Sequence, residues 1–308
     1  MWVVLAFVSA LCLGFYDVSK KIALRDNAVI DVLTASVLIS SVILCVPLLL
    51  SRIAPETIQA TPFYVPEMSL RGHLLTVLKS VIVLSSWVFS YVSLKHLPIS
   101  VVSPWQATRP MWTLFGALLL FGERLNSWQW LGFVLAVGSI LVFSVFSKHS
   151  GEAKQGNKSY YIALALAILI GSCSGLYDKY MMRQYDHNAV QVYYTFYQAV
   201  MMLGVWSIDR FAIRAKNKDK NVSVLLTPSS LLPVALISIF LVISDNVYML
   251  ALQDPDSMIA VVSTIRRGGA VIGFAYGLIY LKEQDPWKKV LSMIGVLAGL
   301  ACLAIGTL

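Results

Sequence analysis

Residues 12–29 read CLGFYDVSKKIALRDNAV, and residues 173–190 read CSGLYDKYMMRQYDHNAV. At a constant offset of 161, seven of these eighteen positions are identical. The identical residues of the first segment are Cys12, Gly14, Tyr16, Asp17, Asn27, Ala28 and Val29. At an offset of 160, Val101-Val102-Ser103 and Glu123 meet Val261-Val262-Ser263 and Glu283. The chain therefore consists of two related halves, which we place at residues 1–150 and 151–308.

The composition indicates a membrane protein. Of the 308 residues, 58% are hydrophobic and only 13% are charged, and the mean hydropathy is +0.74. A soluble domain carries about 25% charged residues because its surface faces water. A span needs about 20 mostly apolar residues, and ten ranges qualify: 2–24, 28–51, 73–94, 98–121, 127–147, 159–183, 188–208, 230–252, 257–281 and 287–307. The two long loops are predicted at 52–72 and 209–229.

Five spans in each half have a topological consequence. Because five is odd, the second half enters the membrane from the opposite face, which makes an inverted repeat. The fold class predicted is an all-α integral membrane protein with ten transmembrane helices in two five-helix inverted-topology repeats. Such a pair makes the same closing movement toward either side. The substrate site is then expected near the midplane, where the halves meet.

Several motifs resemble those of the EamA-type branch of the drug/metabolite transporter superfamily. Gly14 to Lys21 (GFYDVSKK) is similar to the family's first-helix motif. Residues 121–125 (FGERL) resemble the turn after its fourth helix, with a weaker echo in Leu281-Lys282-Glu283. Trp130-Leu131-Gly132 and Ile294-Gly295 continue the pattern. The resemblance implies a ten-helix secondary transporter of a small molecule, in the cytoplasmic (inner) membrane of a bacterium.

Basic residues within the predicted spans suggest the substrate. A charge near the bilayer centre costs at least about 2.5–3.5 kcal/mol on insertion scales, so it usually faces a partner or a watery cavity. Arg109, Arg266, Arg267 and Lys79 lie in spans. The family usually carries apolar or small residues where the three arginines stand. A guanidinium offers a planar donor fork to a carboxylate or phosphate, so these four residues are predicted to bind an anion. Trp105, Gln106 and Tyr197 are added as lining residues.

Three acidic residues in the spans are candidates for proton coupling. Asp17 and Asp178 occupy equivalent positions of the repeat, and each follows a tyrosine. The alternative for Asp17 is an i,i+4 ion pair with Lys21. Asp245, which Asn246 and Tyr248 accompany, is either a proton carrier or an arginine partner. Glu123 and Glu283 fall at helix ends, where we expect them to cap a following helix or to bond loop groups.

Other functions fit the sequence less well. The chain lacks a GxxxxGK[ST] phosphate loop, and His73, His96, His149 and His187 form no HExxH motif. We expect no enzyme activity, metal, cofactor or nucleic-acid partner. An exporter of neutral amino acids or drugs with structural arginines is the main alternative, followed by a channel or a non-transporting receptor. A monomer is consistent with these features.

Two indicators disagree on which side of the membrane the termini lie. The family resemblance puts both termini inside. The ten-span topology then assigns five of the 24 basic residues to inner loops and fifteen to outer ones. Basic residues favour cytoplasmic loops, so the charge count favours both termini outside.

Overall fold

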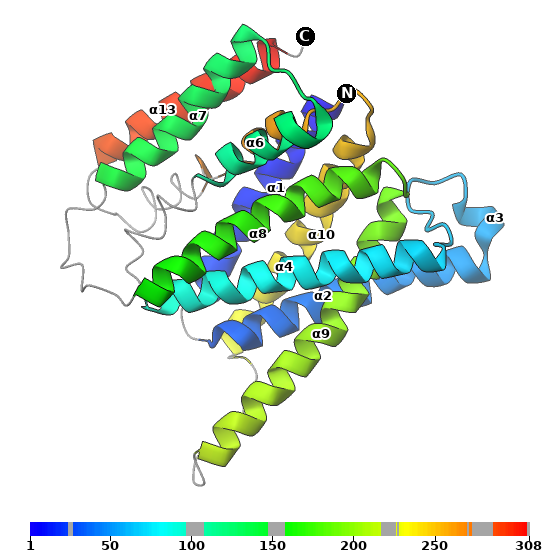
Figure 1. The fold of residues 1–308 in the computed structure, drawn as a ribbon. Helices are drawn as coiled ribbons and strands as arrows, with labels where there is room; N and C mark the ends of the chain where they lie inside the picture. The colour runs from blue at the N-terminus through cyan, green and yellow to red at the C-terminus, as the bar shows by residue number, and fades with distance from the viewer. Residues whose placement is uncertain are drawn as a thin grey trace.

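The structure, a computed structural model, describes residues 1–23, 27–96, 108–146, 158–216, 226, 228–269, 271–272 and 286–306. This part of the chain forms eleven α-helices, one 3₁₀ helix and no strand (Figure 1). The helices are α1 (Trp2–Ala23), α2 (Val29–Ile53), α3 (Pro55–Ile58), α4 (Leu70–His96), α6 (Arg109–Phe121), α7 (Ser127–Phe146), α8 (Lys158–Met182), α9 (His187–Lys216), η2 (Pro228–Ser230), α10 (Leu231–Gln253), α11 (Ile259–Arg267) and α13 (Pro286–Ile305).

Helix lies within each of the ten ranges predicted as spans, with two differences. The prediction ended the seventh span at 208, but α9 continues to Lys216 and takes the first residues of the predicted loop 209–229. The ninth span was predicted as one stretch over 257–281, but α11 ends at Arg267. There the backbone tightens, because Gly268 and Gly269 donate to the carbonyls three residues earlier, at 2.8 and 3.4 Å. Gly268 itself keeps ordinary helical angles, with φ −58° and ψ −20°.

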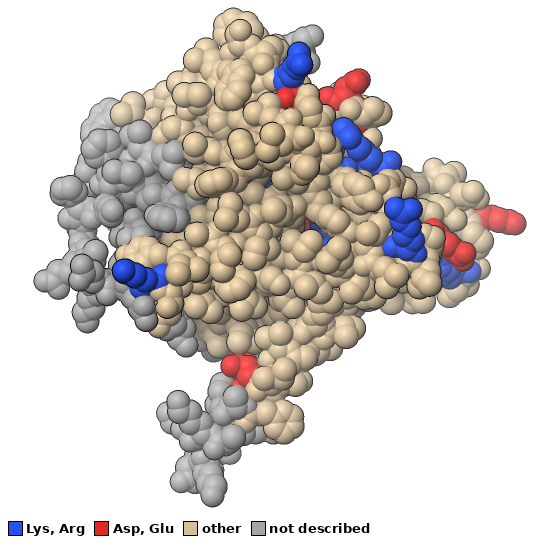
Figure 2. All heavy atoms as spheres, viewed as in Figure 1, with Lys and Arg blue, Asp and Glu red and all other residues tan. Residues whose placement is uncertain are grey.

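Five helical stretches in the described part of the chain are long and apolar enough to cross a membrane. They are Trp2–Lys20, Val29–Ile53, Leu70–Ser90, Lys158–Met182 and Leu231–Gln253. The face in Figure 2 agrees with this, because a broad uncharged surface separates the charged side chains gathered toward its ends. Crossing by the remaining predicted spans stays a prediction.

The most extensive helix contacts join one half of the sequence to the other. Helix α1 packs on α10, α4 on α8, α2 on α9, α6 on α11, and α7 on α13. The α4–α8 pair is antiparallel, since Ser86 donates to the Ala167 carbonyl at 2.8 Å and Ser93 to the Tyr160 carbonyl at 3.3 Å. The α7–α13 pair also runs antiparallel (Figure 1), with Asn126 donating to the Gly306 carbonyl at 2.7 Å.

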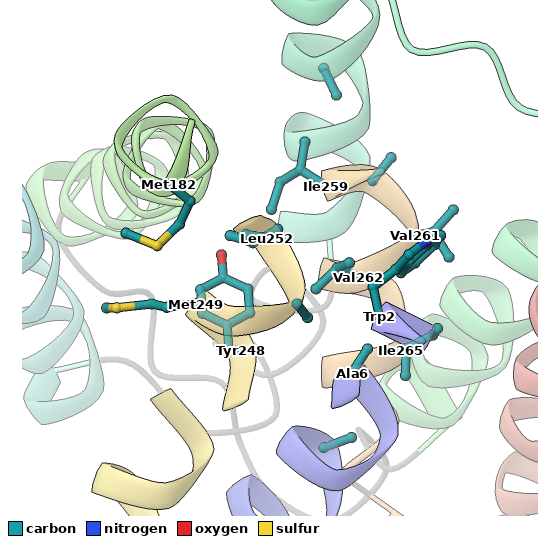
Figure 3. Close-up of a cluster of buried hydrophobic side chains, with 14 of the residues drawn as sticks. Trp2, Ala6, Met182, Tyr248, Met249, Leu252, Ile259, Val261, Val262 and Ile265 are labelled. Carbon is teal, nitrogen blue, oxygen red and sulfur yellow. The ribbon is translucent and has the colours of Figure 1, made fainter. Parts of the chain in front are cut away.

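The main core lies where α1, α8, α10 and α11 meet (Figure 3). Ile259, Val262 and Ile265 of α11 face Leu252 of α10 and Ala6 of α1. The α11 side chains are fully buried, although their helix has only nine residues. The core therefore fixes α11, whose last turn carries Arg266 and Arg267, against helices of both halves.

The segment between α2 and α4, predicted as a loop, is anchored by hydrogen bonds. Val65 is buried, its N–H donates to the Ser51 hydroxyl at 3.0 Å, and its carbonyl accepts from Arg52 at 3.1 Å. Asn188 of α9 donates to the carbonyls of Pro62 and Tyr64 at 2.8 and 3.0 Å. This segment of the first half is therefore held by the second.

Replacing Gly299 with alanine is expected to destabilise the α7–α13 pair. A Cβ atom at Gly299 would lie 2.5 Å from the Ala136 nitrogen and 2.7 Å from the Gly132 carbonyl oxygen. Small residues allow such close helix contact in membranes, and overpacking costs about 1–3 kcal/mol. A lower thermal unfolding midpoint in detergent checks this. Gly138→Ala is the control, because no atom lies within 4 Å of its added Cβ.

Candidate functional site

The charged residues predicted for the site come from five helices. Lys79 lies on α4, Arg109 on α6, Asp178 on α8, Asp245 on α10, and Arg266 and Arg267 on α11. Arg109 lies close enough to Arg266, Arg267 and Asp178 to interact with them electrostatically. Residues far apart in the sequence thus form one charged group between the halves, which we call the central cluster. It consists of these six residues.

Lys79 and Asp178 form an ion pair in the interior. The Lys79 side chain is only 3% exposed, and its ammonium group lies 4.4 Å from the centre of the Tyr194 ring. An ammonium group favours the face of an aromatic ring. The antiparallel packing of α4 and α8 brings the two charges together, and Asp178 thereby has a basic partner that the sequence around it does not supply.

Arg266 and Asp245 form a second ion pair. The Arg266 guanidinium lies 4.1 Å from the centre of the Tyr248 ring and 3.5 Å from the Ser244 hydroxyl. Among the described residues, its Nε has no hydrogen-bond partner. Of the two roles predicted for Asp245, the structure therefore shows the arginine partner.

Arg109 binds a neutral group instead of an acid. Its Nη2 donates to the Gly171 carbonyl at 2.5 Å, and the Ser172 hydroxyl donates to the Arg109 carbonyl at 3.2 Å. No carboxylate in the described part of the chain forms an ion pair with it. Among the described residues, no bonded acid therefore neutralises the guanidinium charge of Arg109.

Arg267 also lacks an ion-pair partner within the described ranges. Asp17 of α1 is close enough to interact with it electrostatically, while the Asp17 side chain is exposed. A Cβ atom at Gly269 would lie 2.3 Å from the Ala10 carbonyl oxygen, and one at Gly14 2.6 Å from the Gly269 carbonyl oxygen. The glycine pair thus lets α1 approach the turn directly after Arg267.

The other predicted site residues lie elsewhere or outside the description. Trp105 and Gln106 lie outside the described residues. The Tyr197 hydroxyl bonds to His73 Nδ1 at 3.0 Å, so it does not join the pairs above. Two contacts were missed from the sequence. Ser244 precedes Asp245 and was findable by position, whereas the Gly171 carbonyl that holds Arg109 carries no sequence signal.

Replacing Gly171 with alanine is expected to displace the Arg109 guanidinium without unfolding the protein. A Cβ atom there would lie 2.5 Å from Arg109 Cζ, and the end of a flexible side chain moves more easily than backbone. Anion affinity should fall while the unfolding midpoint stays within about 2 °C. Gly175→Ala, one turn further along α8, is the matched control, since the atom nearest to its Cβ is 3.9 Å away. Equal effects of the two variants would contradict this role of Gly171.

Comparisons with known proteins agree with the family that the motifs resemble. Residues 1–145 match the profile of the EamA-like transporter family. No curated protein matches the chain. Among solved structures, 28 chains match. One, described only as "Crystal structure of protein", superposes with a TM-score of 0.71 at 13% identity, covering 99% of this chain and 96% of its own. Similarity at that identity shows the shared fold alone. Residues 1–145, just under half of the chain, are therefore similar to the EamA-like transporter family, which is part of the drug/metabolite transporter superfamily, and the long apolar helices indicate an integral membrane protein.

Proposed function

We propose that the protein is a secondary transporter that moves a small polar anion across a bacterial inner membrane by alternating access. The family is one of membrane transporters of small molecules. That the substrate is an anion, that transport occurs by alternating access and that the membrane is a bacterial inner membrane are our proposal. The partners are the substrate and the lipid bilayer, and no catalytic role is proposed.

Two observations support alternating access by inverted repeats. The sequence repeats at an offset of about 161, and the helix contacts follow the same exchange. Under that repeat, α1 corresponds to α8 and α4 to α10. The pair α1–α10 then corresponds to α8–α4, and both are close contacts. Likewise, α2 corresponds to α9, and these two helices are in contact with each other. Exchange of this kind is what a pseudo-two-fold axis between residues 1–150 and 151–308 requires.

The observation that carries the anionic substrate is the charge balance at the centre. Two of the four basic residues of the central cluster are in ion pairs, whereas Arg109 and Arg267 form none with the described residues. Asp17, which is close enough to Arg267 to interact with it electrostatically, has an exposed side chain. With Asp17 added to the cluster, four basic groups and three acidic groups leave an excess of one positive charge among the described residues. Buried charge without a partner is costly, so an entering anion lowers the free energy of this arrangement. One guanidinium comes from each half, which suits a site between them.

For proton coupling, Asp178 is the better candidate of the three predicted carboxylates. Its partner is a lysine, whose ammonium group gives up its proton when buried more readily than a guanidinium does. Asp245 pairs with Arg266, which holds its charge across the working pH range. An anion bound at Arg109 lies within reach of the Asp178 charge and favours its protonated form. We therefore propose that Asp178 takes up the proton.

A neutral substrate is the second candidate, because one observation favours it. Arg266 is bonded to Asp245, and Arg109 donates to a backbone carbonyl. An exporter of neutral amino acids or drugs with structural arginines would hold them in this way. Arg267 distinguishes the two candidates, since it has no bonded acid in the described part of the chain.

A thermal-shift screen of the purified protein tests the substrate class. Carboxylates, inorganic phosphate, neutral amino acids and nucleosides are each added to excess, because a ligand at about 100 times its Kd stabilises by roughly 2.7 kcal/mol. Stabilisation by anions alone, followed by saturable uptake into liposomes, supports the proposal. Stabilisation only by neutral compounds rejects the anion, and non-saturable flux rejects alternating access in favour of a channel.

A further inference from the structure

Glu123, which follows α6 in the first half, binds the N-terminus of α11 in the second half. Its Oε1 accepts from the Ile259 N–H at 2.7 Å, and its Oε2 accepts from the Ala260 N–H at 3.1 Å. A carboxylate suits this place because the first N–H groups of a helix lack partners within the helix and carry partial positive charge. From the sequence, Glu123 was expected to cap a following helix or to bond loop groups. The structure instead uses it across the interface between the halves.

The turn before Glu123 directs it toward α11. Gly122 ends α6 with φ +63° and ψ +24°, a left-handed conformation that glycine adopts without steric strain. The Gly122 N–H donates to the Ala117 carbonyl, as in helix ends of this type. The chain can therefore leave the helix sharply and place the next side chain against the other half.

The turn between α10 and α11 is held by a buried lysine. Lys179 of α8 is fully buried and donates to the carbonyls of Leu252, Asp254 and Ser257 at 3.2, 3.3 and 2.8 Å, and to the Ser257 hydroxyl. Lys179 and Arg183 of α8 interact electrostatically with Glu123. Burial raises the pKa of the Glu123 carboxyl, while the bonds from Ile259 and Ala260 lower it.

Helix α11 connects this contact to the central cluster. Ile259 is its first residue, and Arg266 and Arg267 stand in its last turn. Seven residues of α-helix separate Ile259 from Arg266, or about 11 Å. A helix this short moves as one body, so a displacement of its N-terminus reaches both guanidinium groups.

We propose that Glu123 is a latch between the two halves. Its carboxylate holds the N-terminus of α11 while this end of the molecule is closed, and it releases α11 when the halves separate there. Because α11 also carries Arg266 and Arg267, opening this end repositions the arginines. The latch rests on the proposed alternating access, since it requires that the halves move apart. It does not require that the substrate be an anion.

Distance measurement between two spin labels tests the latch. The labels are attached at Arg71→Cys, at the start of α4, and Asp256→Cys, in the turn before α11, both of which are exposed. Cys12, Cys45, Cys173 and Cys302 are first replaced by serine. The labelled protein in lipid nanodiscs is compared with Glu123→Ala, Glu123→Gln and the control Glu67→Gln, all without ligand. Glu67 is an exposed acid at the same end of the molecule.

We expect Glu123→Ala to gain a population at longer distance, Glu123→Gln a smaller one, and Glu67→Gln none. The glutamine variant retains one oxygen acceptor and guards against a fold defect in the alanine variant. An unchanged distribution in both Glu123 variants, or an equal gain in Glu67→Gln, overturns the latch.

A binding measurement separates the latch from the substrate class. The best anion of the thermal-shift screen should bind Glu123→Ala with a Kd changed at least about fivefold, the lower end of ordinary coupling between sites. A longer-distance population without anion binding to any variant leaves the latch standing and rejects the anion. Anion binding with an unchanged distance distribution supports the anionic substrate and rejects the latch.

Discussion

Replacing Arg109 or Arg267 with alanine is expected to weaken anion binding by about 30-fold to several thousandfold. Removing one partner of a buried, hydrogen-bonded charge pair costs about 2–5 kcal/mol, and 1.4 kcal/mol is a factor of ten in Kd. Both guanidinium groups lack a bonded carboxylate in the described part of the chain. Each is therefore available to a bound anion. Titration calorimetry with the best anion of the thermal-shift screen gives the change in Kd directly.

Arg266→Ala provides an internal comparison, because Arg266 already has a carboxylate partner. We expect it to lower the unfolding midpoint more than Arg109→Ala does, because it leaves Asp245 without its partner. Arg124→Ala is the outer control, since Arg124 is exposed in the loop after α6 and should bind the anion like the wild type. Equal losses of affinity in Arg124→Ala and Arg109→Ala would mean that general charge, and not a site between the halves, attracts the anion.

Asp178→Asn is expected to destabilise the protein by about 3–5 kcal/mol, because it leaves a buried lysine without its carboxylate. Lys79 is 3% exposed and cannot reach water without moving. For a protein of this size, about 1 kcal/mol shifts the unfolding midpoint by roughly 2–4 °C, so a fall of about 6 °C or more is expected. The unfolding midpoint is measured in detergent by following tryptophan fluorescence as the protein is heated.

The double variant Lys79→Met/Asp178→Asn separates the charge from the packing. It removes both charges at similar volume and should regain most of the lost stability, since replacing a whole buried pair is often neutral. A double variant as unstable as Asp178→Asn would assign the effect to shape instead. If Asp178 also carries the proton, anion uptake by the folded double variant loses its dependence on a pH gradient. Retained dependence assigns coupling to another group.

The internal repeat and the motifs were enough to predict the family. Glycines 14 and 122 illustrate why, because each stands where the backbone must approach a neighbour or turn with positive φ. Such constraints are local and leave only one residue type, so they appear in a sequence. The sequence was also enough to identify the basic residues that lie within apolar segments, because a charge in an apolar run is visible without a structure. These residues are Lys79, Arg109, Arg266 and Arg267.

The partners of those charges were not readable in advance. Asp178 was predicted as a candidate for proton coupling with no partner named, yet Lys79, 99 residues away in sequence, meets it through the antiparallel packing of α4 and α8. Arg266 and Arg267 were both predicted to bind an anion, but the structure bonds Arg266 to an acid and leaves Arg267 without one in the described part of the chain. Adjacent residues on a helix point in directions about 100° apart, so only their neighbours decide which is bonded.

The sequence by itself determined that the chain is a helical membrane protein with motifs similar to those of the EamA type and with basic residues in its apolar segments. Apolar length, repeated motifs and misplaced charges are properties of single segments, which a sequence displays directly. The tertiary structure alone decided which charges are paired, that Glu123 caps α11 across the halves, and that Gly171 holds Arg109. These are contacts between helices distant in sequence, and their geometry follows from how the helices pack against one another.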